Sequence, residues 1–279
     1  MDGRALAARI REELKDEIAE FGDVGLATVL VGDDPASQIY IRLKHKAADE
    51  VGIQAIDKRL PAETSDEELV ELVEELNEDD SVDGILVQTP LPPQIDEARV
   101  MRALDPMKDV DGLHPFNAGQ LFFGRQTLVG ATPVGVMRLL GEYGIRVAGA
   151  RAVVVGRSLI VGRPLAMLLL HANATVTICH SRTEELAHHT LDADILVAAV
   201  GQLGLITADM VKQGAAVIDV GMNRTDDGLF GDVDRQVAEV AAFLTPVPGG
   251  VGPMTIACLL ENALKAARYR SGALVFPRI

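Results

Sequence analysis

Hydrophobic and polar residues alternate along the N-terminal part of the chain in a way that predicts helices and strands in turn. Leu6, Ile10, Leu14 and Ile18 recur at helical spacing, which predicts an amphipathic helix. The apolar run that follows at 26–31 predicts a buried strand. Such an order is typical of β-α-β units and favours a mostly parallel sheet. The further elements predicted here are helices at 35–51 and 66–76, the second capped by Thr64 or Ser65, and strands at 53–60 and 84–88.

The pattern loses its regularity between residues 89 and 132, where several prolines interrupt the backbone. Because prolines remove donors and end helices, we expect turns and short helices here, and a domain junction and a ligand cleft both fit this region. Regular elements return in the order of a doubly wound dinucleotide-binding fold, and we expect the last helix to pack on the first domain. The predicted elements are helices at 133–143 and from 162, strands at 152–155, 174–178, 195–199 and 215–220, an irregular segment at 245–253 and a helix to about 268.

Composition limits the class of protein. With 279 residues, of which 48% are apolar, the chain can bury a substantial core, which excludes disorder. No apolar run reaches the roughly 20 residues of a membrane helix, and the N-terminus lacks a targeting segment, so we expect a cytoplasmic protein. The net charge of −15 argues against non-specific nucleic-acid binding. Cys179 and Cys258 lack partners for a metal cluster, so we expect reduced thiols and no metal site.

The turn after the strand at 152–155 has the composition of a dinucleotide-binding turn. Gly156 allows the chain to turn under a pyrophosphate, and a helix beginning near Gly162 offers backbone N–H donors. The usual three glycines are not present, because Ser158 and Val161 stand at the second and third glycine positions. Taken alone, the segment is equally compatible with an ordinary strand-to-helix turn.

The end of the next predicted strand indicates which dinucleotide is bound. Folds of this kind usually carry an acidic residue there, which binds the ribose 2′-hydroxyl. Here Ser181 and Arg182 occupy the position, and Arg157 lies on the neighbouring turn. A hydroxyl and guanidinium groups suit a 2′-phosphate, so the sequence favours NADP over NAD. The alternative for Arg182 is an ordinary surface arginine.

A tyrosine and a lysine lie on one face of the predicted helix at 35–51. Tyr40 and Lys44 are four residues apart, so both side chains project from the same face. Short-chain dehydrogenases carry such a pair downstream of the nucleotide turn, whereas here it lies far upstream, so that interpretation fails on order. The pair alone leaves open an ordinary packing role with a solvated ammonium.

Three further segments favour a functional role for Tyr40 and Lys44 over a packing role. They are Leu86-Val87-Gln88-Thr89-Pro90-Leu91-Pro92, Lys108-Asp109-Val110-Asp111-Gly112 and Pro246-Val247-Pro248-Gly249-Gly250-Val251-Gly252-Pro253-Met254-Thr255. Together with Gly156-Arg157-Ser158 and His180-Ser181-Arg182, they closely resemble the bifunctional methylenetetrahydrofolate dehydrogenase/methenyltetrahydrofolate cyclohydrolase family. The resemblance covers nearly the whole chain in the same order, and the proline- and glycine-rich segment is very specific.

The resemblance implies an enzyme of one-carbon folate interconversion. Such an enzyme oxidises 5,10-methylenetetrahydrofolate with NADP and hydrolyses the methenyl product to 10-formyltetrahydrofolate. We expect a catalytic folate domain at 1–118 and 255–279, and a Rossmann-like NADP-binding domain at 119–254. The resemblance also implies a homodimer that binds tetrahydrofolate derivatives. From the net charge and the short apolar runs we expect no nucleic-acid partner and no membrane partner.

The same resemblance implies roles for individual residues. Lys44 matches the central catalytic residue and Tyr40 the aromatic partner near the pterin. Gln88 matches the group that hydrogen-bonds and tunes Lys44, and Asp111 the acceptor of pterin N–H donors, whereas Asp109 is expected to be structural. The wider substrate site comprises Val87, Thr89, Pro248, Gly249, Gly250 and Pro253, and the cofactor site comprises Gly156, Arg157, Ser158, Ser181, Arg182 and Met222.

The chemistry agrees with these roles. Loss of hydride from the methylene carbon leaves an iminium cation, so the first step needs positioning rather than a strong base. In the second step water attacks the methenyl carbon, and a lysine with a lowered pKa can accept or relay a proton. Whether Lys44 acts directly or through water stays open. Two alternatives also remain: a chain with one of the two activities, and a nucleotide-sensing scaffold on the same fold.

Two positions depart from the family pattern. Met222 stands where many relatives have isoleucine, and it still offers apolar surface to a cofactor. Thr89 stands where a leucine is common. Both departures leave the resemblance intact, and we expect them to adjust cofactor preference or substrate affinity.

Overall fold

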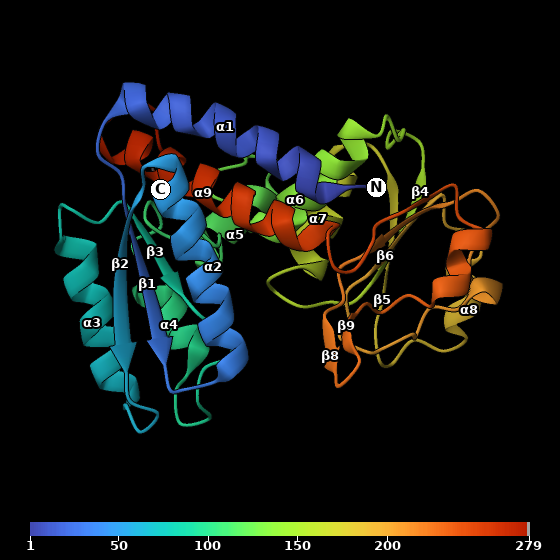
Figure 1. Ribbon diagram of the computed structural model, residues 1–279, viewed down its shortest axis with the longest axis horizontal. Helices are drawn as coiled ribbons and strands as arrows, with labels where there is room; N and C mark the ends of the chain where they lie inside the picture. Colours follow the sequence, from blue (N-terminus) through green and yellow to red (C-terminus); the bar gives the residue numbers. More distant parts are fainter. Residues whose placement is uncertain (278–279) are drawn as a thin grey trace. The chain divides into compact units, whose positions relative to one another are not determined.

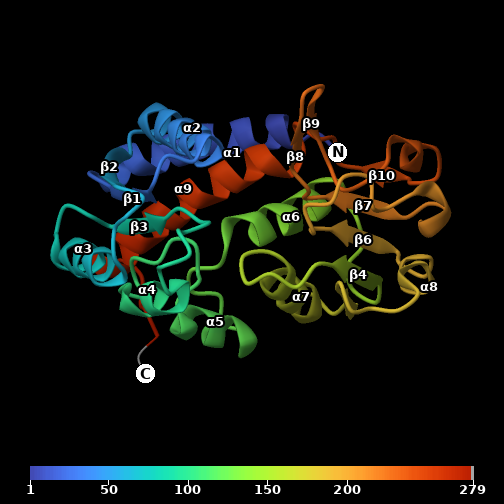
Figure 2. The same cartoon turned by 90° about the horizontal axis from the view of Figure 1, so that it is seen from below.

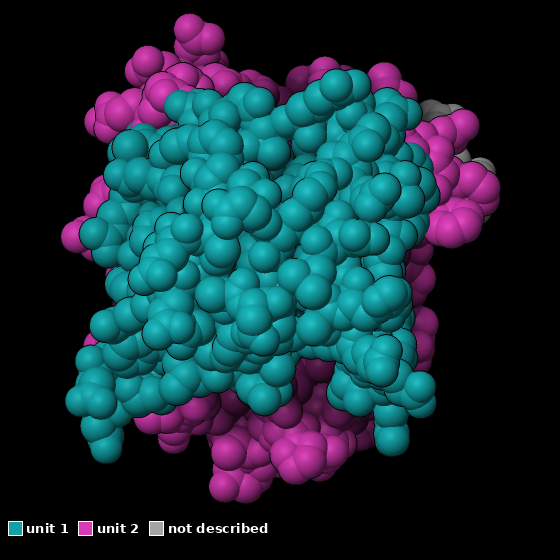
Figure 3. Space-filling view, turned by 90° about the vertical axis from the view of Figure 1, so that its right-hand side faces the viewer, with its two compact units in different colours: residues 1–8, 132–255 teal, residues 9–131, 256–279 magenta. Residues whose placement is uncertain are grey.

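The computed structural model describes residues 1–277, which form two compact α/β units (Figures 1 and 3). Unit 1 comprises Met1–Ala8 and Thr132–Thr255, and unit 2 comprises Arg9–Ala131 and Ile256–Ile279. The boundary between Ala131 and Thr132 lies later in the chain than the domain boundary expected from the sequence at 118/119. No helix among the described residues is long and apolar enough to cross a membrane.

The first residues of the chain belong to unit 1 because they bind its last segment. The N-terminal ammonium donates to the carbonyl of Leu244 over 2.6 Å, and the Gly3 N–H donates to the carbonyl of Gly249 over 2.9 Å. A Cβ on Gly3 would overlap the carbonyl oxygen of Gly250, so a side chain does not fit there. The sequence-based division instead groups residues 1–8 with the rest of 1–118, most of which lies in unit 2.

Unit 2 is built around a parallel three-stranded sheet in the order β2-β1-β3, visible in Figure 1. The central strand is buried along its whole length, which explains its mostly apolar sequence, and its one hydroxyl, on Thr28, is hydrogen-bonded to His45 over 2.7 Å. Helix α3 begins with a capping box between Ser65 and Glu68, as its sequence predicts. The elements are α1 (Gly3–Phe21), β1 (Gly25–Val31), α2 (Pro35–Val51), β2 (Gln54–Leu60), α3 (Asp66–Glu78), β3 (Gly84–Val87), α4 (Glu97–Ala103) and α5 (Pro115–Phe122).

Unit 1 contains a parallel five-stranded sheet in the order β10-β7-β6-β4-β5, and Figure 2 labels β10, β7, β6 and β4 in that succession. The chain order reverses between β4 and β6, the kind of switch point at which open α/β sheets bind ligands. The predicted doubly wound fold is confirmed. The elements are α6 (Ala131–Glu142), β4 (Arg151–Val155), α7 (Gly162–His171), β5 (Thr175–Cys179), α8 (Leu186–Thr190), β6 (Ile195–Ala198), η1 (Ala208–Met210), β7 (Ala216–Asp219), β8 (Asn223–Thr225), β9 (Gly228–Phe230), η2 (Arg235–Glu239) and β10 (Phe243–Leu244).

The last helix, α9 (Val251–Arg270), starts earlier than expected. The segment at 245–253 was predicted to be irregular, but the helix begins within it, because Pro253 lies in the first turn, where no intrahelical donor is lost. Residues from Ile256 onward belong to unit 2, so the expected return of this helix to the first domain is confirmed. Cys258 on this helix and Cys179 on β5 are both buried free thiols.

Candidate active site

Helix α2 holds Tyr40 and Lys44 one turn apart. Asp34 caps the helix by accepting a hydrogen bond from the Ser37 N–H over 2.7 Å. Ile41, between the two site residues, is fully buried and packs the helix onto unit 2. Tyr40 and Lys44 are half-buried and so lie at the border of this apolar face, whereas Ser37 is buried. The helix therefore presents both predicted side chains from one rigid support.

Gln88 fixes the ammonium group of Lys44. It directly follows β3, and its backbone N–H donates to Val29 on the neighbouring strand over 2.9 Å. Lys44 Nζ donates to Gln88 Oε1 over 3.0 Å, and Gln88 Nε2 donates to the carbonyl of Thr89 over 2.7 Å. This second bond turns the amide so that its oxygen faces the lysine. Val87, just before Gln88, is buried in β3, and Thr89 is half-buried.

Burial and charge move the pKa values of Lys44 and Asp111 toward each other. Desolvation lowers the pKa of Lys44, and the negative charge of Asp111 partly opposes this shift. Desolvation raises the pKa of Asp111 to about 6, with Lys44 opposing the shift and the buried Asp109 adding to it. At pH 7 most Asp111 side chains are therefore ionised, and Lys44 loses its proton more readily than an exposed lysine.

The segment that carries Asp111 is anchored by buried polar side chains just before it. Lys108 is 1% exposed, and its Nζ donates to the carbonyls of Leu76 and Asp79 at the end of α3 over 2.9 and 2.8 Å. These bonds satisfy carbonyls that lie at the helix terminus. Asp109 is equally buried and accepts from the Asn117 amide over 2.9 Å. The expected structural role of Asp109 agrees with these contacts.

Asn262 on α9 anchors the same segment from another direction. Its Nδ2 donates to the carbonyls of Val110 and Val129 over 2.7 and 2.8 Å, and the side chain is buried. Gly112, directly after Asp111, has a φ of +65°, and a Cβ there would lie 2.7 Å from the carbonyl oxygen of Leu128. Asp111 is therefore held between two anchored neighbours. Asn262 was missed by sequence reasoning, because a single polar residue in an apolar helix has no distinctive spacing.

In unit 1, the turn after β4 is shaped for close backbone contact. Gly156 has a φ of +133°, and a Cβ on it would overlap the carbonyl oxygen of Ala199 at the end of β6. A Cβ on Gly162 would overlap the carbonyl oxygen of Gly156. Both glycines are therefore required to bring the start of α7 against the ends of β4 and β6. This cradle fits a dinucleotide pyrophosphate.

Ser158 forms hydrogen bonds within its own turn. Its Oγ accepts from the N–H groups of Val161 and Gly162 over 3.1 and 3.4 Å, so the serine holds the backbone that leads into α7. Those two donors are not free for a phosphate. Among the described residues 1–277, however, no group accepts a hydrogen bond from the backbone N–H of Leu159 or Ile160. These two donors on the exposed turn are therefore available to a ligand.

The side chains predicted to bind the 2′-phosphate of NADP lie on exposed loops of unit 1. Ser181 and Arg182 follow β5, and a turn fixes them, because His180 Nδ1 accepts from the Arg182 N–H over 3.1 Å. Arg157 is exposed on the turn after β4, and β4 and β5 are paired neighbours. The adjacency of the strands thus brings both arginine-bearing loops to the same edge of the sheet. Met222 is exposed beyond the end of β7.

The proline- and glycine-rich segment packs against the chain's own N-terminus. Gly249 has a φ of +116°, and a Cβ there would lie 3.0 Å from Nε of Arg4. Gly250 is packed against Gly3, so both glycines make close contacts within the protein. Pro248 is exposed and Pro253 half-buried. The predicted substrate residues of this segment belong to unit 1, and the other substrate residues belong to unit 2.

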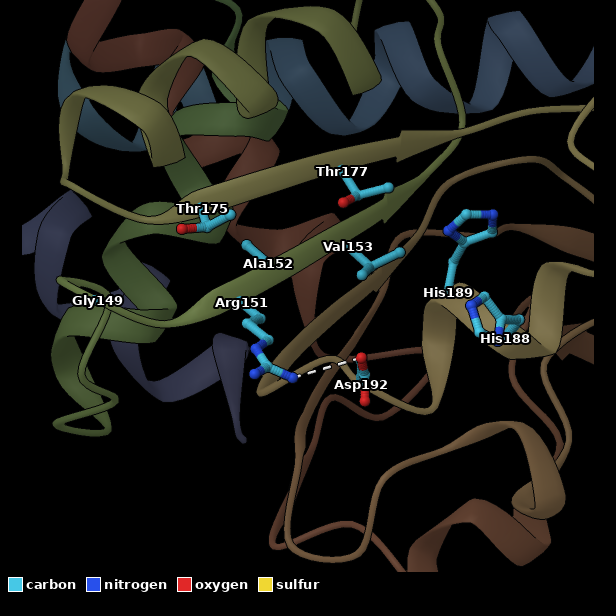
Figure 4. A pocket seen from close by; sticks show the side chains of 9 residues that line it. All are labelled: Gly149, Arg151, Ala152, Val153, Thr175, Thr177, His188, His189 and Asp192. Carbon is cyan, nitrogen blue, oxygen red and sulfur yellow. Dashed lines mark ion pairs between the residues drawn. The ribbon is translucent and has the colours of Figure 1, made fainter.

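A surface cavity in unit 1 does not coincide with the predicted sites. It has a volume of about 310 Å³ and is lined by residues of β4, β5 and α8, with an ion pair of 3.4 Å between Arg151 and Asp192 at its edge (Figure 4). None of its lining residues is a predicted site residue. Across the described part of the chain, no cluster of three or more His, Cys, Asp or Glu side chains is arranged to hold a metal ion.

Comparison with known proteins identifies the family. The model of the tetrahydrofolate dehydrogenase/cyclohydrolase catalytic domain matches residues 1–111, and that of the NAD(P)-binding domain matches residues 130–271. The chain belongs to the tetrahydrofolate dehydrogenase/cyclohydrolase family. The bifunctional protein FolD of Methanospirillum hungatei is 55% identical to it over 274 residues, which cover 98% of both chains.

Solved structures of this tetrahydrofolate dehydrogenase/cyclohydrolase family share the fold. The bifunctional FolD enzyme of Campylobacter jejuni superposes with a TM-score of 0.93 at 47% identity, covering 96% of this chain and 98% of the other. The dehydrogenase-cyclohydrolase of Trypanosoma brucei, solved with NADP and an inhibitor, has a TM-score of 0.93 at 42% identity and covers 98% of both chains. The predicted family is therefore confirmed.

Proposed function

We propose that this chain oxidises 5,10-methylenetetrahydrofolate to 5,10-methenyltetrahydrofolate with NADP, and hydrolyses the product to 10-formyltetrahydrofolate. The observation that carries this proposal is the bond between Lys44 and Gln88, with the carboxylate of Asp111 acting on the same lysine. A nucleotide-sensing scaffold would need a dinucleotide turn but no such cluster. Family membership supports both activities together.

Asp111 is proposed to orient the substrate. An ionised carboxylate accepts two N–H bonds from an aminopyrimidinone edge, which gives direction as well as affinity. The anchoring of its neighbours by Lys108 and Asn262 supports this role, because a fixed acceptor loses little entropy on binding. Tyr40, one turn before Lys44, is proposed to stack near the pterin. We assign substrate contacts also to Val87, Thr89, Pro248, Gly249, Gly250 and Pro253.

In the oxidation, the side chains hold the substrate and limit charge repulsion. Bound NADP supplies the acceptor for the hydride of the methylene carbon. The organic product is a cation, so a fully charged ammonium beside it would oppose its formation. The lowered pKa of Lys44 reduces this repulsion, and the carboxylate of Asp111 favours the cation. The protein thus contributes position and electrostatics rather than a strong base.

In the hydrolysis, Lys44 is proposed to manage the proton of the attacking water. Water adds to the methenyl carbon and loses a proton, and the carbon–nitrogen bond to N5 then breaks as that nitrogen is protonated. The added hydroxyl releases its proton to solvent as the formyl carbonyl forms. A neutral amine can take the first proton and return it to the leaving nitrogen. Gln88 holds Nζ in place through this exchange, because its own amide is fixed by Thr89.

The cofactor is proposed to bind unit 1, with NADP preferred to NAD. The cradle of Gly156 and Gly162 supports a pyrophosphate site, and Ser181, Arg182 and Arg157 at one edge of the sheet support a 2′-phosphate. We propose Met222 as a contact of the cofactor, and Ser158 as the residue that shapes the turn. The corresponding functional division is a folate domain at 1–118 and 255–279 and an NADP-binding domain at 119–254.

We also propose a cytoplasmic homodimer whose product supplies one-carbon units to purine biosynthesis. Strand β5 ends its sheet, and no described strand pairs with its outer side. Open strand edges are usually covered, and the exposed apolar side chains of Leu170, Ile178 and Leu191 support burial here by a second copy. The net charge of −15 supports the absence of a nucleic-acid partner.

The function is tested by following NADPH and methenyltetrahydrofolate absorbance in one reaction of the purified protein with 5,10-methylenetetrahydrofolate. We expect NADPH to accumulate while the methenyl compound appears only transiently, and we expect NADP to be used faster than NAD. A methenyl compound that persists at its uncatalysed lifetime would indicate a dehydrogenase alone. Absence of NADPH together with hydrolysis of added methenyltetrahydrofolate would indicate a cyclohydrolase alone. Absence of both would favour a scaffold.

A further inference from the structure

Two aspartates are buried together at the carboxyl ends of β6 and β7. Asp219 is the last residue of β7 and is 4% exposed, and Asp232 follows β9 and has no exposed surface. Carboxylates are seldom buried unless their oxygens are paired, because removal from water is costly. The groups that these two side chains bind therefore show what their burial achieves.

Asp219 holds the backbone on both sides of the β8–β9 hairpin. Its Oδ1 accepts from the N–H groups of Gly221 and Asp232, each over 2.9 Å, and its Oδ2 accepts from Val233 over 3.0 Å. A Cβ on Gly231 would overlap Oδ2, so the chain passes directly against the carboxylate. Burial raises the pKa of Asp219 to about 6, and the three N–H bonds oppose that shift.

Asp232 joins the ends of two neighbouring strands. Its Oδ2 accepts from the N–H groups of Val200 and Gly201 after β6, over 2.7 and 3.0 Å. Its Oδ1 accepts from Nδ2 of Asn223 over 2.9 Å, just beyond β7. A Cβ on Gly221 would overlap the same carboxylate. The two aspartates together thus accept six hydrogen bonds, and these fix the segments that follow β6 and β7.

The fixed segments present apolar side chains beside the switch point of the sheet. Because the N–H groups of Val200 and Gly201 point inward to Asp232, the backbone there cannot donate to a ligand. The side chains of Val200 and Met222 are instead 37% and 43% exposed. In a doubly wound sheet, β4 and β5 serve the adenosine half of a dinucleotide, and the strands beyond the switch point serve the other half. Such an apolar surface suits one face of a flat nicotinamide ring.

We propose that Asp219 and Asp232 are positioning residues for the nicotinamide half of NADP, which they serve by fixing the Val200–Gly201 and Gly221–Asn223 segments. This inference rests on the proposed NADP-dependent oxidation. The aspartates touch neither substrate nor cofactor in this role. They set the surface on which the ring lies, and so they control the position of the carbon that receives the hydride.

The test compares two activities and a binding constant in the full-length protein. Asp219→Asn keeps size and removes charge, whereas Asp232→Ala removes the acceptor of three bonds. Asp226→Asn is the matched control, because Asp226 is exposed on the same hairpin. The measurements are NADP affinity by calorimetry, NADP reduction, and hydrolysis of added methenyltetrahydrofolate, which needs no hydride acceptor and whose proton transfers are assigned to Lys44 in unit 2.

We expect both variants to bind NADP roughly tenfold or more weakly and to form NADPH correspondingly slowly, with hydrolysis within about twofold of wild type. Asp232→Asn should restore part of the loss, because its amide oxygen can serve Val200 and Gly201 while the Asn223 amide turns. Equal losses of both activities in Asp219→Asn, or unchanged NADP affinity, would overturn this inference and leave the proposed function standing. A wild-type protein that reduces no NADP would instead overturn the proposed function.

Discussion

The pKa of Asp111 makes the pH dependence of substrate capture a demanding test of the site. Desolvation raises this pKa from 3.8 to about 6, so the folded protein binds the proton as the pH falls through that value. Only the ionised carboxylate accepts two N–H bonds. The ionised fraction falls from about nine-tenths at pH 7 to about one-tenth at pH 5, so kcat/KM for 5,10-methylenetetrahydrofolate should fall roughly tenfold over this range.

The assay is the initial rate of NADPH formation at low substrate concentration across pH 5 to 8. Asp111→Asn should have a low rate without this pH step, whereas Asp49→Asn, at an exposed position on α2, should keep it. A raised carboxyl pKa means that the ionised group disfavours the folded state at pH 7, so Asp111→Asn should not lower the melting temperature. A wild-type kcat/KM that is constant between pH 5 and 7, or the same step in Asp111→Asn, would refute the role of this carboxylate.

Three other substitutions probe separate parts of the account. Arg182→Ala should weaken NADP binding by roughly 10- to 100-fold and NAD binding by about twofold at most, as measured by calorimetry, because a charge-assisted bond is lost only for NADP; equal losses would show that the arginine does not bind the 2′-phosphate. Gln88→Glu places a carboxylate beside Lys44, so it should raise the pKa of Lys44 and move the pH midpoint of hydrolysis up by about one unit or more. An unchanged midpoint would show that the ionisation of Lys44 does not control the hydrolysis rate. Asn262→Leu should lower the unfolding free energy by roughly 2–4 kcal/mol in a denaturant titration, because two buried carbonyls lose their donor, and an unchanged value would contradict this anchoring role.

Local sequence rules predicted most helices and long strands of this fold. The bounds of α2 follow from Asp34 and Pro35 at its start and from Gly52, which has a left-handed conformation, at its end. The hairpin β8–β9 and the two-residue strand β10 were not predicted, because such short strands lack a periodic pattern. The early start of α9 also escaped prediction, because its first turn contains Gly252 and Pro253, residue types that usually mark irregular backbone.

The candidate site, too, was predicted only in part from local sequence. Helical spacing placed Tyr40 and Lys44 on one face, but Gln88, which binds Lys44, is brought near by the pairing of β3 with β1. Family resemblance supplied that link, whereas the residues alone left a packing role open. The buried anchors Lys108 and Asn262 bind backbone carbonyls, and these contacts exist only after the chain has folded.

The most direct test of the central claim is the fate of methenyltetrahydrofolate in Lys44→Met. The account places the proton transfers of hydrolysis on Lys44 and the cofactor in unit 1, so this variant should fold, bind NADP with wild-type affinity and hydrolyse added methenyltetrahydrofolate no faster than buffer. Absorbance of the methenyl compound, followed beside calorimetric NADP binding, gives both results on one sample. Hydrolysis at the wild-type rate would contradict the account.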